Sequence, residues 1–191
     1  MNTFYSEEEL AGLGLKAYGK NVFIGRNAIL YNPEKLTLGH DVRIDDFTVI
    51  SGTVTLHNYI HISHFCGLYG GDEGIEMMDF SGLSSKVNIY AVSDDYSGES
   101  MTNPMVPMEY KKTMISAKVL LEKHSIIGNN TAVLPGVTVS EGCSIGSMSL
   151  CSKSTEPWSV YVGIPAKKLK DRKKEILELE KRFKESGEYY E

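Results

Sequence analysis

The sequence lacks several features that mark whole classes of protein. No stretch of its 191 residues approaches 18 consecutive apolar positions, so no transmembrane helix is expected. Basic residues are not in excess: 20 Lys and Arg stand against 25 Asp and Glu, a net charge of -5. This balance argues against a nucleic acid or an anionic membrane as partner. With neither a P-loop nor a GxGxxG motif, a nucleoside triphosphate or dinucleotide cofactor is not expected.

Cysteine is also scarce. Cys66, Cys143 and Cys151 are an odd number without the spacing of a metal site, which favours free thiols in a reducing compartment. The first residues, MNTFYSEEEL, are acidic and have no apolar core of a signal peptide. We therefore expect a cytoplasmic protein without a metal ion.

What the sequence does contain is a repeat with a period of six residues. From Ile24 onward an aliphatic residue or Cys recurs at every sixth position, apart from two short insertions and one long interruption after Ile89. The residues two places earlier are mostly small or β-branched. The first set is Ile24, Leu30, Leu38, Ile44, Ile50, Leu56, Ile62, Leu68, Met77, Leu83, Ile89, Leu121, Ile127, Val133, Val139, Ile145 and Cys151. The second set is Val22, Ala28, Leu36, Val42, Thr48, Val54, Ile60, Cys66, Ile75, Ser81, Val87, Val119, Ser125, Thr131, Val137, Cys143 and Ser149.

A period of six matches neither an α-helix nor a hairpin sheet. It matches a parallel β-helix in which each unit makes one short strand and one corner, with two residues of the strand pointing inward. Three units then close a coil of about 18 residues. A β-sandwich would instead show irregular strand spacing and hairpin dipeptides such as Asn-Gly, which the repeating part lacks. The predicted fold is an all-β solenoid over residues 20–166, with an inserted loop at 90–118.

The two ends of this solenoid need covers. Ser6 and Glu9 have the spacing of a capping box and predict a short helix within residues 1–19 that covers the first coil. Lys167 to about Lys184 is rich in helix formers and predicts a C-terminal helix within 167–191, on the solenoid or on a neighbouring subunit. Its apolar residues fall near one face: Leu169, Ile176, Leu179 and Phe183.

The segments IGRNAIL, LGHDVRIDDFTVI and IIGNNTAVLPGVTVSEGCSIG resemble the hexapeptide repeats of left-handed β-helix acyltransferases. The order of coils, long loop, coils and then GIPAKKLK is similar to that of galactoside and maltose acetyltransferases. RIDDF, SDDYSGES, TNPMVP and VGIPAKK resemble the branch that acylates nucleotide-linked amino sugars for lipopolysaccharide or capsule. The left hand of the helix is implied by this resemblance. So are acetyl-CoA as co-substrate, a sugar or nucleotide-sugar acceptor, and a homotrimer with active sites in the clefts between subunits.

One departure from the family concerns the inserted loop. Family enzymes of the galactoside type carry a catalytic histidine there; the matching position is Asp94, and the loop contains no histidine. A sugar hydroxyl benefits from a general base with a pKa near neutrality, which a carboxylate of pKa ~4 does not supply unless its pKa is raised. An amine arrives partly as an ammonium ion, which a carboxylate can bind and deprotonate. Asp94 therefore favours N-acylation, with Asp95 and Tyr96 as acceptor-binding residues, while O-acetylation of a glycoside or polysaccharide hydroxyl stays open.

Two histidines could still supply a catalytic base. His61 and His64 flank the inward Ile62 one coil before the loop; otherwise they are solvent-facing imidazoles at a strand end. Asp45 and Asp46 sit just outside an inward aliphatic residue, where they either contact sugar hydroxyls or form a solvated corner. The other histidines are expected at ordinary surface positions: His40, His57 and His124.

The resemblance also implies where acetyl-CoA binds. The family's small-residue stretch and Thr-Lys pair match Gly146–Ser147 and Ser152–Lys153, and its Gly-x-Pro element matches Gly163-Ile164-Pro165. Lys153 and Lys167 would meet the phosphates of the cofactor; alternatively the lysines are simply solvated and the glycines serve corners with positive φ. The cofactor-binding candidates are Gly146, Ser147, Ser152, Lys153, Gly163 and Lys167.

Two other classes of β-helix protein fit this sequence less well. A γ-carbonic-anhydrase-like zinc protein needs three converging histidines, and His61 and His64 have no partner at the expected separation. A non-catalytic β-helix, acting as a scaffold or surface binder, leaves the aromatic-rich loop without a role. The sequence therefore predicts an acyltransferase.

Overall fold

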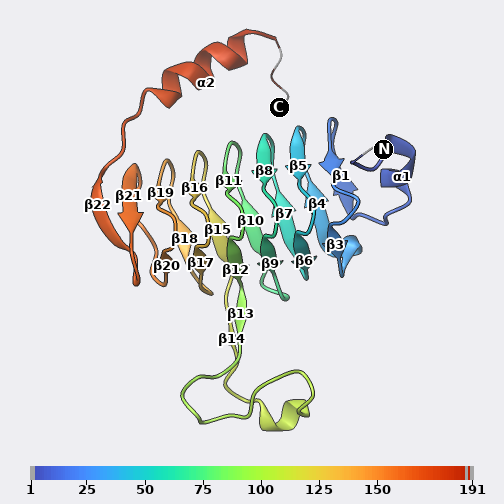
Figure 1. The fold of residues 1–191 in the computed structure, drawn as a ribbon, viewed down its shortest axis with the longest axis vertical. Helices are drawn as coiled ribbons and strands as arrows, with labels where there is room; N and C mark the ends of the chain where they lie inside the picture. The colour runs from blue at the N-terminus through green and yellow to red at the C-terminus, as the bar shows by residue number, and fades with distance from the viewer. Residues whose placement is uncertain (1–2, 188, 190–191) are drawn as a thin grey trace.

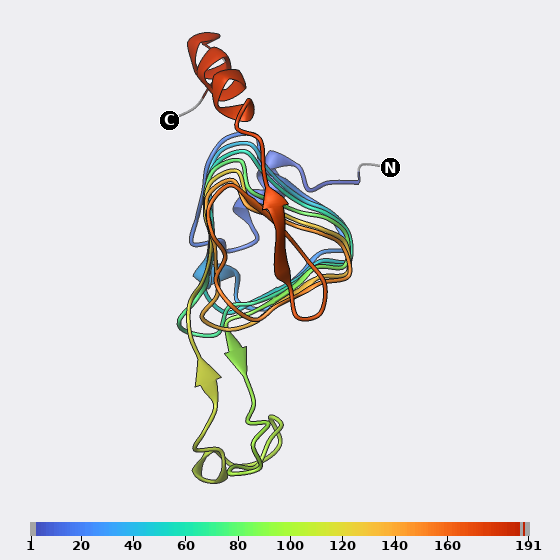
Figure 2. The same ribbon diagram turned by 90° about the vertical axis from the view of Figure 1, so that its left-hand side faces the viewer.

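The computed structural model describes residues 3–187 and 189 and has the parallel β-helix that the repeat predicts, with the left hand that the family resemblance implies (Figure 1). Seen end-on, successive coils superimpose as a triangle (Figure 2). Each side of the triangle is one sheet, here called sheets 1, 2 and 3, whose neighbouring strands come from successive coils. Among the described residues, no helix is long and apolar enough to cross a membrane.

The strands of each sheet follow the order of the coils. Sheet 1 contains β1 (Ala17–Tyr18), β4 (Leu36–Leu38), β7 (Val54–Leu56), β10 (Ile75–Met77), β15 (Val119–Leu121) and β18 (Thr138–Val139). Sheet 2 contains β2 (Phe23–Ile24), β5 (Val42–Ile44), β8 (Ile60–Ile62), β11 (Gly82–Leu83), β16 (Ile126–Ile127), β19 (Ser144–Ile145), β21 (Ser159–Val162) and β22 (Lys167–Asp171). Sheet 3 contains β3 (Ile29–Leu30), β6 (Val49–Ser51), β9 (Gly67–Tyr69), β12 (Asn88–Tyr90), β17 (Ala132–Val133) and β20 (Leu150–Cys151).

The core is the interior of this triangular prism. In the two inward-facing sets predicted from the repeat, every residue is buried except Leu30 and Ala28 in the first coil, which are partly buried. The parallel register stacks like on like from coil to coil, as in Leu38, Leu56, Met77, Leu121 and Val139. Burial of one large aliphatic side chain contributes about 1.5–3 kcal/mol, so these columns hold the coils together.

The three cysteines belong to this core. Cys66, Cys143 and Cys151 are buried and free. Burial raises the pKa of all three thiols, to about 11 for Cys66 and Cys151. A thiol held in its protonated form is a poor nucleophile. The prediction that the three cysteines are buried core residues is confirmed.

The N-terminal cap also has the predicted form. In α1 (Glu7–Ala11) the Ser6 side chain accepts from the Glu9 backbone N–H, and the Glu9 carboxylate accepts from that of Ser6. Glu9 also binds Arg26 at 2.6 Å, which ties the helix to the first coil. Leu10 is the buried residue of the helix and joins the core.

The C-terminal helix begins later than predicted. Residues Lys167–Asp171 form β22, which runs antiparallel to β21, and only Ile176–Glu185 are helical, as α2. Leu169 therefore lies on a strand, not on the helix. The reason is the open edge of β21, the last coil strand of sheet 2, whose backbone groups β22 pairs. After β22 the chain turns back along the solenoid, and α2 lies beside the corner between sheets 1 and 2 (Figure 1).

Glu180 is the main polar anchor of α2. It contacts Lys123, His124 and Lys184, and Phe183 packs edge-on against the rings of Tyr59 and Phe80. His124 was expected at the surface but is 3% exposed, because its ring stacks on Phe80 at 5.2 Å and the helix covers it.

This anchor makes helix docking sensitive to acid. Burial raises the pKa of Glu180, but hydrogen bonds from Lys123, Lys184 and His124 outweigh it and lower the pKa to about 2. The stabilisation is thus present above the ordinary value of 4.5 and is lost as pH falls toward 2. Glu180→Gln should weaken docking by about 1.5–3 kcal/mol and remove this pH dependence. Amide hydrogen exchange of α2 measures both effects, and Glu178→Gln, on the same helix, should leave exchange unchanged; equal protection in the two variants would contradict the assignment.

Candidate active site

The inserted loop of the prediction is an arm, residues 91–117, that leaves the solenoid at the end of β12 and projects away from it (Figures 1 and 2). Its base is an antiparallel pair, β13 (Val92–Ser93) and β14 (Ile115–Ser116). At its tip the buried Lys111 donates its Nζ to the carbonyl of Asn103 at 3.1 Å. The arm therefore has a defined structure of its own.

Asp95 is the residue that shapes the arm. One carboxylate oxygen accepts from the backbone N–H and hydroxyl of Ser97, and the other accepts from the backbone N–H groups of Gly98 and Ser100. The Ser97 hydrogen bonds, with those from Ser100 and Gly98, lower the pKa of Asp95. With both oxygens occupied, Asp95 fits a turn-forming role, and this argues against the acceptor-binding role predicted for it.

Asp94 is placed differently. Its Oδ2 accepts from the backbone N–H of Asn103 at 3.1 Å, and the residue lines a hollow of about 780 Å³ between the arm and sheet 3, here called the arm cleft. The cleft brings Asp94 together with two other predicted site residues, Ser152 and the 92% exposed Tyr96. Its walls are largely apolar: Tyr90, Val92, Ile115, Leu134, Pro135 and Leu150.

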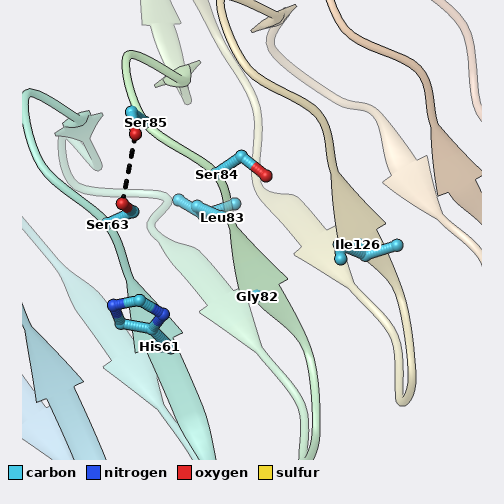
Figure 3. A pocket seen from close by; sticks show the side chains of 7 residues that line it. All are labelled: His61, Ser63, Gly82, Leu83, Ser84, Ser85 and Ile126. Carbon is cyan, nitrogen blue, oxygen red and sulfur yellow. Dashed lines mark hydrogen bonds between the residues drawn. The ribbon is translucent and has the colours of Figure 1, made fainter.

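A second hollow lies on sheet 2, around Gly82. The outward-facing residues of neighbouring strands here are His61, Gly82 and Ile126, so the missing side chain of Gly82 leaves a gap between two large ones (Figure 3). This Gly82 notch has a volume of about 350 Å³ and is also lined by Ser63, Ser84 and Ser85. The hydroxyls of Ser63 and Ser85 form a hydrogen bond at 3.2 Å, whereas the hydroxyl of Ser84 points away from them (Figure 3).

The corner between sheets 2 and 3 carries a row of equivalent residues, one per coil. Backbone hydrogen bonds link each strand end to the next coil and place Asp45, Ser63, Ser84, Gly128 and Gly146 in line. We call this the corner row. A Cβ on Gly146 would stand 2.7 Å from the Val162 side chain, and one on Gly128 2.5 Å from the Ser147 nitrogen, so close packing of coils also accounts for these glycines.

Asp45 gathers three basic side chains at one end of the corner row. Its carboxylate is 4% exposed and contacts Arg43 Nε at 2.7 Å, His61 Nε2 at 2.8 Å and His64 Nδ1 at 3.0 Å. Burial raises the pKa of Asp45, but the hydrogen bonds from His61 and Arg43 outweigh it, so the net pKa lies below its ordinary value. The alternative of a solvated corner is therefore wrong for Asp45, which is a buried anion that fixes its neighbours.

The two hollows lie at different corners of one protomer. Ser84 precedes β12 and lies at the corner between sheets 2 and 3, whereas Asp94 follows β12 at the base of the arm, between sheets 3 and 1. The full width of sheet 3 separates them. A single protomer therefore does not bring the two hollows together.

The remaining predicted residues do not meet in one pocket. Ser147 and Lys153 are exposed at two different corners, while Gly163 donates its N–H to Ser149 Oγ at 3.0 Å. Lys167 is exposed at the start of β22. Across residues 3–187 and 189, no group of three His, Cys, Asp or Glu side chains is arranged to hold a metal ion.

Sequence reasoning did not single out Ser84, Gly82 or the role of Asp45. Each depends on which residues of adjacent coils stand side by side. The signal was present in the repeat, because Ser84 follows Leu83 as Ser63 follows Ile62 and Asp45 follows Ile44.

Comparison with known proteins identifies the family. No protein-family model matches the chain. The dTDP-4-amino-4,6-dideoxy-D-glucose acyltransferase of Escherichia coli is 40% identical over 187 residues, 96% of each chain. AntD, an N-acyltransferase from Bacillus cereus solved with dTDP and 3-hydroxybutyryl-CoA, is 45% identical, with a TM-score of 0.96 over 99% of this chain and 100% of that one. A variant of AntD in complex with dTDP-4-amino-4,6-dideoxyglucose and coenzyme A has a TM-score of 0.95 at 45% identity, over 97% of this chain and 99% of that one. The chain therefore belongs to the hexapeptide-repeat acyltransferases, in the branch that acylates nucleotide-linked amino sugars, as its sequence motifs predicted.

Proposed function

We propose that this enzyme transfers an acyl group from acyl-CoA to the amino group of a nucleotide-linked amino sugar, and that it does so as a homotrimer. The observation that carries the proposal is Asp94, a carboxylate at the arm cleft where an O-acetyltransferase of this fold has an imidazole. The support from relatives is specific: a variant of AntD was solved in complex with a dTDP-linked 4-amino sugar and coenzyme A. Biosynthesis of a surface polysaccharide would use the acylated sugar.

The chemistry needs an amine in its neutral form. The Asp94 carboxylate would hold the ammonium ion of the acceptor by a charge-assisted hydrogen bond, and the Ser84 hydroxyl would orient the nitrogen. After the nitrogen loses its first proton, it attacks the thioester carbonyl carbon. The amide C–N bond forms, the C–S bond breaks, and the second proton from nitrogen ends on the sulfur of the departing coenzyme A. An amine is nucleophilic enough to need no imidazole base for this step. His61 and His64 thus need not act as the base predicted for them.

The separation of the two hollows within one protomer supports the proposed trimer. If the arm cleft of one protomer faces the Gly82 notch of the next, Asp94 and Ser84 meet across the interface. In this arrangement the projecting arm would pack against the neighbouring protomer, and a second chain would close each arm cleft. The corner row continues from Ser84 to Gly128 and Gly146, so coenzyme A would lie along it, with Ser152 of the arm cleft opposite.

The donor acyl group and the compartment belong to the same proposal. The sequence predicts acetyl-CoA as the donor, and AntD was solved with 3-hydroxybutyryl-CoA. Both acyl-CoA molecules are therefore candidate donors. We place the reaction in the cytoplasm, in keeping with three free thiols.

Thiol release tests the proposal directly. Purified enzyme with acetyl-CoA or 3-hydroxybutyryl-CoA should release coenzyme A with dTDP-4-amino-4,6-dideoxyglucose, and mass spectrometry should find the added acyl group on nitrogen. The matched acceptor is the same nucleotide sugar with a 4-hydroxyl in place of the amine, which should give no release. Release with the hydroxyl sugar alone would establish O-acylation instead, and no release with any sugar nucleotide would reject the enzyme assignment.

A further inference from the structure

We propose that Arg43, His61 and His64, the three basic side chains gathered on Asp45, bind the diphosphate of the nucleotide-linked acceptor. This basic cluster is a subsite of the same reaction centre, so the inference rests on the proposed function. It assigns a binding role to residues that the transfer step itself does not use.

The cluster is built rather than incidental. The Asp45 carboxylate is 4% exposed, while the side chains of Arg43, His61 and His64 are 51%, 52% and 53% exposed. One buried anion therefore fixes three cationic or ionisable groups that each keep a solvent-facing side. Arg43 is further held over the ring of Phe4, with its Cζ 5.2 Å from the ring centroid. Such preorganisation lowers the entropy cost of binding an anion.

Each member keeps nitrogen atoms that do not contact Asp45. Arg43 uses Nε on Asp45 and keeps the N–H groups of its terminal nitrogens. His61 uses Nε2 and His64 uses Nδ1, so each ring has its other nitrogen free of Asp45. When protonated, these second nitrogens donate as well. Arginine and imidazolium groups on one site match the oxygens of a diphosphate.

The position of the cluster along the solenoid fits the length of the acceptor. Arg43 and His61 are the register partners that precede Gly82 in the outward ladder of sheet 2, two coils and one coil before Ser84 respectively. Neighbouring strands lie about 4.8 Å apart. In a 4-amino sugar the amine and the anomeric oxygen stand at opposite ends of the ring. If coenzyme A lies along Gly128 and Gly146 as proposed, an acceptor whose amine is at Ser84 would extend its diphosphate the other way, toward His61 and Arg43.

Coenzyme A also carries phosphates, so the shared chemistry has two possible sources. The layout favours the acceptor, because the glycines of the corner row lie on the opposite side of Ser84 from the basic cluster. Binding of dTDP and of coenzyme A, measured separately, distinguishes the two.

The test compares two probes in the intact protein. Isothermal titration calorimetry with dTDP and with thymidine isolates the contribution of the phosphates. Arg43→Gln should weaken dTDP binding roughly 10–100-fold, while the affinities for thymidine and coenzyme A stay unchanged. His64→Gln provides a second variant with an effect of the same direction, in case Arg43→Gln fails to fold. Arg26→Gln is the matched control, because it removes an arginine paired with Glu9 rather than with Asp45.

The outcomes separate this subsite from the proposed function. Unchanged dTDP affinity in folded Arg43→Gln and His64→Gln would overturn the inference. So would an equal loss of thymidine affinity, which indicates damage to the site, or a loss confined to coenzyme A. Because no step of the titration requires acyl transfer, a selective loss for dTDP would support the subsite even if the transfer assay failed.

Discussion

Asp94→Asn should lower kcat for acyl transfer about 10²–10⁴-fold, the range for loss of a group that handles a proton in the reaction. The amide keeps the shape of Asp94 and can still accept from the Asn103 N–H, so the arm should keep its structure. What it loses is the negative charge that, in the proposed mechanism, holds the ammonium ion and takes its first proton. The measurement is steady-state thiol release with the amino-sugar acceptor.

Two comparisons make this result specific. Glu99→Gln removes an exposed carboxylate of the same arm and should leave kcat unchanged. Raising the pH should restore part of the activity of Asp94→Asn, because more of the acceptor then arrives as neutral amine. Full activity of Asp94→Asn at neutral pH would remove Asp94 from the mechanism.

The same variant tests whether the site spans two subunits. Asp94→Asn and Ser84→Ala should each be nearly inactive alone. If each cleft combines Asp94 of one protomer with Ser84 of the next, a mixed trimer contains one cleft in which both residues are intact. Refolding the two variants together should then recover up to about one-third of wild-type activity. No recovery, with mixed trimers demonstrated, would place both residues in the same protomer's site.

The architecture was predictable because it is a local property. Ile62 and Val133 both point into the prism, and this follows from strand alternation within one six-residue unit. The same alternation applies in every coil. The sites were not predictable to the same degree. The proposed roles of Ser84 and Asp45 depend on their alignment along the corner row. That alignment depends on the insertions in the repeat as well as on its period.

For three features the structure differs from the prediction because of contacts that the six-residue repeat does not specify. The sequence predicts Asp95 as a free acidic side chain, but in the structure it accepts hydrogen bonds from the backbone N–H groups of Gly98 and Ser100. The sequence predicts His124 as a surface residue, but in the structure α2 covers it and Glu180 contacts it. The start of α2 depends on the open edge of β21, which captures residues whose own propensity is helical. For His124 and for the start of α2 a tertiary partner overrides the local pattern, whereas the partners of Asp95 lie within five residues in one turn.

Gly82→Val should raise KM for the acceptor about 10–200-fold while leaving the affinity for coenzyme A unchanged. Each methylene-sized misfit in a binding pocket has roughly this effect, and the valine side chain would stand in the Gly82 notch between His61 and Ile126. The backbone tolerates the change: the nearest atom to an added Cβ is the His61 carbonyl oxygen at 3.5 Å, an ordinary contact. Because valine favours a strand where glycine weakens it, Tm should hold or rise. Gly82→Ala should give a smaller increase in KM. A normal KM in a stable Gly82→Val enzyme would show that the sugar does not enter the notch, and Ser84 would then lose its proposed role with it.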